Sequence, residues 1–121
     1  MKSLQTSKVK TTPTGYTGKY QCDASDKRTI RLPNGEDIAT TCLLVDEFDL
    51  VAVNLFAFGE EWRFAFAKNS DLQRSRYRGY TEEQRKYLLA SLQPATWPPE
   101  PPYEAEPWGL MDEIVAQKKT R

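Results

Sequence analysis

The strongest pattern of apolar and polar positions in the chain runs from residue 48 to residue 67. Residues 49–56 are almost continuously apolar, which predicts a strand that is covered on both faces and lies in the middle of its sheet. A turn at 59–61 leads into a return segment that alternates large and small side chains: Trp62, Arg63, Phe64, Ala65, Phe66 and Ala67. Because neighbouring strand residues face opposite sides, the return strand should have a bulky face and a small face, and a helix can pack closely on the small one.

Weaker strand signals precede this hairpin. Residues 7–11 predict a short strand. Residues 28–38 predict two strands joined by a turn at Pro33-Asn34-Gly35, because proline, asparagine and glycine favour turn backbones.

A helix is predicted to begin at Thr81. Thr81 and Gln84 fit a capping box, and the two glutamates after Thr81 stand where the helix dipole favours negative charge. Three apolar side chains then fall on one helix face: Tyr87, Leu88 and Leu92. Pro94 should end the helix, because proline lacks the N–H that a helix interior needs.

The C-terminal part of the chain is rich in proline. Residues 94–107 hold six of the eight prolines, so this segment should lie extended against the domain, held by Trp97 and Tyr103. A final helix is predicted over 108–118, with Met111, Ile114 and Val115 on one face.

These elements predict an α+β fold built on a mixed sheet of four or five strands, with one or two helices and a proline-rich C-terminal wrap. A length of 121 residues predicts a single domain over 1–121. Its core of sheet and helix would span 1–93, the extended segment 94–107 and the last helix 108–118.

The composition excludes several kinds of chemistry. The chain has no histidine, which excludes a Ser-His-Asp triad, a Cys-His nucleophile and zinc sites that need histidine. Cys22 and Cys42 are too far apart for a C-x-x-C motif, and we expect them to be small, buried, reduced side chains. No apolar run is long enough to span a bilayer, and the N-terminus lacks the apolar core of a secretory signal. We therefore expect a cytoplasmic protein without a membrane partner.

Charge is unevenly distributed although its total is zero. Bases prevail over 1–31 and 68–86, and residues 99–113 carry acids only. Arg74, Arg76 and Arg78 alternate with other residues, so in an extended loop they would point one way and could meet phosphates, with Tyr77 and Tyr80 close enough to stack on a base or sugar. The alternative is a solvated loop whose arginines pair with the acidic segment.

Candidate metal ligands are few. Asp46, Glu47 and Asp49 could hold a hard cation at a sheet edge. The alternative is a polar turn before a buried strand. The glycines are isolated from one another, so no glycine-rich phosphate loop is present.

The block at 48–67, the segment 71–75 and the stretch 7–15 together resemble restriction-endonuclease-like proteins of the PD-(D/E)XK class. The resemblance covers residues 8–92 and implies that the hairpin supports the sheet that carries the active site. It matches Lys10 to the catalytic lysine. It also places Lys8 where the family has a metal-binding acid, and the family's earlier aspartate would lie upstream of the first residue. Phosphodiester hydrolysis needs carboxylates to hold its cation.

The resemblance therefore implies a DNA-binding, endonuclease-like remnant or split subunit that is inactive alone and needs no cofactor. Its partners would be duplex DNA and a second chain that supplies the missing part of the domain. The backbone would be gripped on one face by Tyr77 and five cations: Lys8, Lys10, Arg74, Arg76 and Arg78. One alternative is an active Mg²⁺-dependent deoxyribonuclease in which Asp49, with 61–63 across the hairpin, holds the metal. The other is a protein-interaction module, an inhibitor or assembly subunit, whose contact surface is the acidic proline-rich tail.

Overall fold

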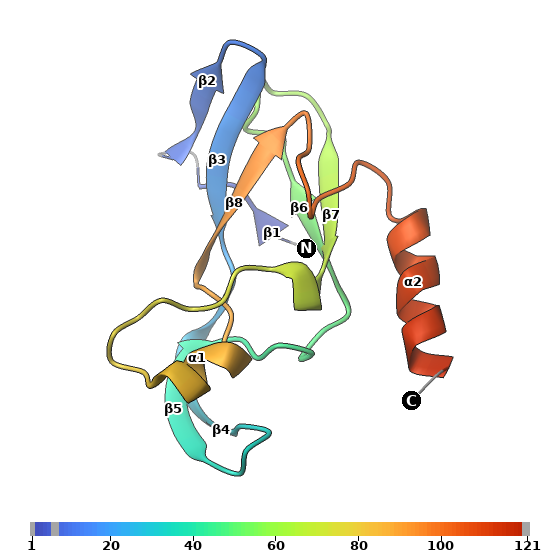
Figure 1. The fold of residues 1–121 in the computed structure, drawn as a ribbon. Coiled ribbons are helices and arrows are strands. Elements are labelled where there is room, and N and C mark those ends of the chain that lie inside the picture. The colour runs from blue at the N-terminus through green and yellow to red at the C-terminus, as the bar shows by residue number, and fades with distance from the viewer. Residues whose placement is uncertain (1, 6–7, 120–121) are drawn as a thin grey trace.

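The computed structural model describes residues 2–5 and 8–119, and the side chain of Ser25 is left out of that description. Within these residues the chain forms three small sheets and two α-helices (Figure 1). The α+β class predicted from the sequence is confirmed. The single sheet of four or five strands is not found, because the strands divide into sheets of three, three and two.

The predicted hairpin lies in the first sheet, whose strand order is β1-β6-β7. The short β1 (Lys2–Ser3) runs parallel to β6 (Leu50–Asn54), and β6 pairs antiparallel with β7 (Phe64–Lys68). The prediction of a hairpin with a central first strand is therefore confirmed. Its burial differs from the prediction, since alternate residues of β6 are buried rather than all of them.

The second sheet has the order β2-β3-β8, in which β3 (Gly15–Gln21) is central between β2 (Lys10–Thr12) and β8 (Leu92–Trp97). The strand expected near 7–11 is thus found as β2, and residue 7 lies outside the described residues. The third sheet is the hairpin of β4 (Asp23–Arg31) and β5 (Asp37–Cys42). Only Cys22 separates β3 from β4, so one extended run of chain passes from the second sheet to the third.

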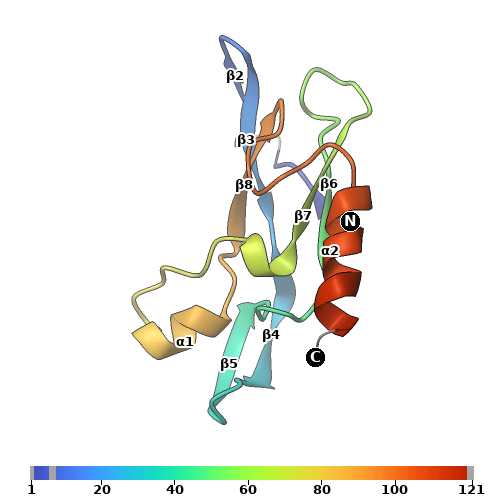
Figure 2. The same cartoon turned by 45° about the vertical axis from the view of Figure 1, so that its right-hand side comes forward.

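The first two sheets face each other, and the core lies between them (Figure 2). The alanines of β7 are in this core and pack with residues of β3 and β8. The expectation that a helix packs on the alanine face is therefore wrong, because the second sheet occupies that side. The helix α2 (Trp108–Lys119) lies outside β6 and β7 on the opposite face, where Lys68 of β7 pairs with Glu113 at 3.5 Å.

The helix α1 is shorter than predicted and spans Glu82–Tyr87. Its capping box is confirmed: Gln84 N donates to Thr81 Oγ1 at 3.1 Å, and Thr81 N donates to Gln84 Oε1 at 2.9 Å. The helix ends because Leu88 is extended and its neighbour Leu89 donates its N–H to Leu43 O at 2.8 Å, as part of strand-like pairing with the chain after β5.

Pro94 therefore does not end a helix but lies within β8, opposite Lys19. β8 is at the edge of its sheet, where a residue without an N–H is tolerated. The extended segment after β8 crosses back to β7, where Glu104 and Phe66 exchange two backbone hydrogen bonds of 2.8 Å. The last helix is found at the predicted place. Met111 and Val115 on it are 46% and 50% exposed, while Leu110 is buried.

Candidate functional site

The basic segment forms a loop, residues 73–80, that is anchored along its first half; we call it the arginine loop. Ser75 N donates to Leu88 O at 2.9 Å, and Ala90 N donates to Gln73 O at 2.9 Å. The fully buried Gln93 side chain accepts from Gln73 N at 3.1 Å and donates to Gln73 O at 2.9 Å. These contacts fix where the loop leaves the core.

The three arginines of the loop have different roles. Arg74 folds back and donates to Leu72 O at 2.5 Å and to Ser70 O at 3.0 Å, so its guanidinium closes the end of the 3-10 helix η2 (Asn69–Asp71). Arg76 and Arg78 are exposed, and no hydrogen bond or ion pair of either is found in the described part of the chain. Pairing of the loop with the acidic segment is not seen there either, and Glu113 of that segment binds Lys68 instead.

The tyrosines of the loop form a fixed pair. The rings of Tyr77 and Tyr80 meet edge to face with centroids 5.0 Å apart. The Tyr80 hydroxyl lies 2.6 Å from Thr40 Oγ1 on β5, and burial there raises the pKa of Tyr80. Tyr77 is 64% exposed, and a Cβ on Gly79 would come within 2.3 Å of its ring. In the sequence, the exposed ring of Tyr77 thus stands between two residues with exposed guanidinium groups, Arg76 and Arg78.

The structure does not bring Lys8 and Lys10 to this loop. Lys10 lies in β2 at one end of the molecule, and the arginine loop leads into α1 near the other end (Figures 1 and 2). Lys10 is opposite Thr17, and Lys19 lies two residues further along β3, so Lys10 and Lys19 share the outer face of the second sheet. The expected face of five cations is therefore replaced by two separate basic regions.

The acids around residue 49 are bound to cations of the chain. Asp49 accepts from Lys118 Nζ at 2.8 Å, and Glu47 accepts from Arg28 at 2.5 Å. Among the described residues, no group of three or more histidine, cysteine, aspartate or glutamate side chains could hold a metal ion. The contacts around Asp46, Glu47 and Asp49 are those of a polar turn, the alternative interpretation of this cluster.

The shifted catalytic motif is not assembled by the hairpin. Leu50 pairs with Lys68 and Asn54 pairs with Phe64, so Asp49 lies at one end of the hairpin and residues 61–63 lie at the other. Glu61 forms an ion pair with Arg63 within the turn. Asp49 is also remote from Lys10, because Asp49 binds the last turn of α2 while Lys10 lies in β2 (Figure 1).

An aromatic groove of about 340 Å³ lies beside β7, between that strand, Trp97 of β8 and the chain before α2. Its principal lining residues are Trp62, Arg63, Phe64, Phe66, Trp97 and Glu106. Arg63 lies over the Trp97 ring at 5.1 Å from its centroid, and Trp62 stacks at a tilt on Phe56 with centroids 4.6 Å apart. The groove is absent from the sites predicted above. Its signal in the sequence is the alternation of Trp62, Phe64 and Phe66, which places three aromatic rings on one face of a strand.

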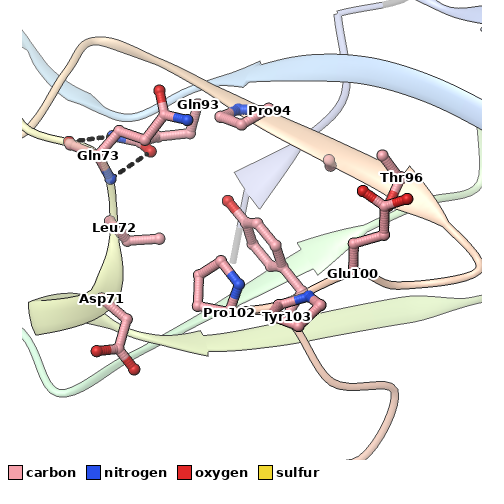
Figure 3. Close-up of a pocket in the computed structure, with 11 residues that line it drawn as sticks. Asp71, Leu72, Gln73, Gln93, Pro94, Thr96, Glu100, Pro102 and Tyr103 are labelled. Carbon is pink, nitrogen blue, oxygen red and sulfur yellow. Dashed lines mark hydrogen bonds between the residues drawn. The ribbon is translucent and has the colours of Figure 1, made fainter.

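A smaller cavity of about 110 Å³ lies where the proline-rich segment crosses β8 (Figure 3). Asp71 and Glu100 stand at opposite ends of it, with carboxylates directed away from each other. Its buried polar groups are already paired, since Gln93 binds Gln73 and the Tyr103 hydroxyl binds Tyr20. The buried polar groups that line the cavity are therefore already used in hydrogen bonds, and its two acids do not converge.

Comparison of the sequence and structure with protein-family models, curated proteins and solved structures found no match. In the described part of the chain, no helix has both the length and the apolar character needed to cross a membrane. The arginine loop, the β2 region and the aromatic groove are the surfaces whose chemistry bears on function.

Proposed function

We propose that the chain is a nucleic-acid-binding module without phosphodiesterase chemistry of its own, and that the arginine loop makes the principal contact. The observation that supports this proposal is the exposure of Arg76, Tyr77 and Arg78 on a loop whose backbone is anchored by β8 and the segment before it. Exposed guanidinium groups bind phosphate oxygens with two parallel hydrogen bonds, and an exposed ring can stack on a base.

The expected strength of binding follows from the number of cations. Two arginines that neutralise two phosphates give a slope of roughly −2 in log affinity against log salt. Affinity should then fall about tenfold between about 50 mM and about 200 mM salt. Lys8 and Lys10 would contact a separate stretch of duplex DNA, because β2 is remote from the loop. Phosphate contacts carry no sequence information, so binding should be largely nonspecific.

The finer part of the proposal rests on the resemblance to PD-(D/E)XK proteins. On that basis, the chain is part of an endonuclease-like fold and completes a nuclease or recognition complex with a partner chain. If the completed assembly cleaves DNA with Mg²⁺, the partner supplies the carboxylates, since Glu47 and Asp49 already bind cations of this chain. We further propose that it acts in the cytoplasm, which the two free buried cysteines support.

The test is a fluorescence anisotropy titration of labelled duplex and single-stranded DNA at low and moderate salt. The double variant R76A/R78A should lose about tenfold in affinity at low salt and show a flatter salt dependence. The matched control is K27A/K119A, which removes two exposed positive charges on other elements. Equal losses in both variants would show that only net charge matters. Absence of binding by the unaltered chain at low salt would refute the proposal.

A further inference from the structure

The aromatic groove combines features of a protein-binding surface. Trp62 is 71% exposed and Phe56 beside it is 38% exposed. Aromatic residues are enriched at protein interfaces, where their large apolar area is desolvated on binding. The groove lies on β7 and the chain before α2, whereas the arginine loop precedes α1. It is thus a second surface, separate from the proposed nucleic-acid contact.

One wall of the groove is an open strand edge. Leu55 N donates to Arg63 O, so the odd-numbered residues of β7 bond to β6 and the even-numbered ones point their N–H and C=O away from it. Phe66 uses these groups to pair with Glu104. Phe64 stands on the same edge, and the described residues show no strand that pairs with it there. The groove opens at the point where the pairing with Glu104 stops.

The charge around the groove favours a cationic ligand. Four exposed carboxylates stand on the lining segments or next to them: Glu60, Glu61, Glu104 and Glu106. Arg63, the one cation among the described residues of the lining, is already bound to Glu61 and stacked on Trp97. Acidic groups would repel a phosphate backbone. A cationic side chain gains both from these carboxylates and from the face of the exposed Trp62 ring.

We propose that the aromatic groove binds an extended, arginine- or lysine-bearing segment of a partner protein. One cationic side chain of the segment lies over Trp62 within reach of Glu106. Its backbone pairs with the free N–H and C=O of Phe64 and so adds a strand to the edge of β7. Main-chain pairing then supplies affinity, and the acid-lined aromatic floor supplies specificity.

The probe is a labelled, acetylated peptide in which arginine alternates with valine, compared with the same peptide carrying glutamate in place of arginine. The arginine peptide should bind and the glutamate peptide should not. Trp62→Ala should weaken binding by about tenfold, as loss of a central aromatic contact does, and Glu106→Gln should weaken it less. Trp108→Ala is the matched control, because Trp108 is 66% exposed but does not line the groove.

The outcomes separate this inference from the proposed function. R76A/R78A should bind the arginine peptide normally, and Trp62→Ala should bind DNA normally. Near-ultraviolet circular dichroism checks that each variant is folded. The inference is overturned if the arginine peptide does not bind at low salt, if the glutamate peptide binds equally well, or if Trp108→Ala weakens binding as much as Trp62→Ala. Displacement of the peptide from the groove by a single-stranded oligonucleotide would assign the groove to nucleic acid instead.

Discussion

The hydroxyl oxygens of Tyr20 and Tyr103 lie 2.7 Å apart in the core, and their rings meet edge to face at 83°. Tyr20 belongs to β3 and Tyr103 to the proline-rich segment, so this hydrogen bond holds that segment to the central strand of the second sheet. The predicted role of Tyr103 as an anchor agrees with its burial, since only 8% of the residue is exposed.

Replacing Tyr103 with phenylalanine should lower the free energy of unfolding by about 1–3 kcal/mol, because it leaves the buried Tyr20 hydroxyl without its partner. Urea denaturation measures the change. Replacing both tyrosines with phenylalanine should cost less than the sum of the single changes, because neither hydroxyl is then left unpaired. Additive losses would show that the two hydroxyls stabilise the fold independently.

The same pair predicts a loss of stability at high pH. Burial raises the pKa of Tyr103 to about 12 and also raises that of Tyr20. The pKa of an unfolded tyrosine is about 10, so the folded state holds these protons more tightly. The contribution of these two hydroxyls to the free energy of unfolding is complete below pH about 10 and is lost as the pH rises through about 12. Unfolding measured across this range should show the loss, and the double phenylalanine variant should show less of it.

Asn69 is a second buried anchor. Its Oδ1 accepts from Asp46 N at 2.6 Å, and its Nδ2 donates to Leu44 O at 3.2 Å. Asn69→Ala should therefore destabilise the chain by about 1–3 kcal/mol in urea denaturation, since two backbone groups lose their partner. Asn34→Ala is the control: Asn34 also binds backbone but is exposed, and its loss should cost no more than about 0.5 kcal/mol.

Arg74 and Arg76 should respond differently to truncation. Arg74 donates to two backbone carbonyls and Arg76 is exposed. Arg74→Ala should speed amide hydrogen exchange at Ser75 and lower the free energy of unfolding by about 1 kcal/mol. Arg76→Ala should change neither quantity while it weakens DNA binding. The distinction fails if both substitutions affect exchange at Ser75 equally.

Gly15 is required by a close approach of two strands. A Cβ on Gly15 would stand 1.8 Å from the backbone oxygen of Trp97. Gly15→Ala should therefore separate the ends of β3 and β8 and cost about 1–3 kcal/mol or more. Gly109→Ala is the matched control, because nothing lies within 4 Å of its Cβ position in α2. It should be neutral or slightly stabilising, as alanine favours helix more than glycine does. Thermal unfolding compares the two.

The local parts of the fold were predictable from the sequence. The 48–67 hairpin has a turn between two strongly patterned segments, and the Thr81 capping box depends on residues three positions apart. The spacing of Leu88 and Leu92 fits one helix face and predicts that both belong to a helix. Leu88 is instead extended because it pairs with Leu44, and Leu92 begins β8. Pairing with distant residues outweighed local preference, and the sequence pattern contains no information on that pairing.

The arrangement of the candidate sites was less predictable. The alternation of Arg74, Arg76 and Arg78 suggested equal roles, but Arg74 binds carbonyl oxygens that only the folded η2 brings within reach. The aromatic groove needs Trp97 beside Arg63, and that contact arises from the packing of two sheets. The positions of charged and aromatic residues along the chain indicate which residues are candidates for a site. Which residues lie beside them in space depends on the topology of the sheets.

The sheet order β2-β3-β8 has a consequence for the chain as it is synthesised. β3 is made early, and its partner β8 follows only after both other sheets and α1 have been translated. Until Gln21 can meet Leu92, one edge of β3 has no partner, and the aromatic face that carries Tyr20 has no proline-rich cover. Such late, non-local closure slows folding and exposes apolar surface to chaperones. A ribosome that stalls before β8 therefore holds a chain that cannot yet close its core.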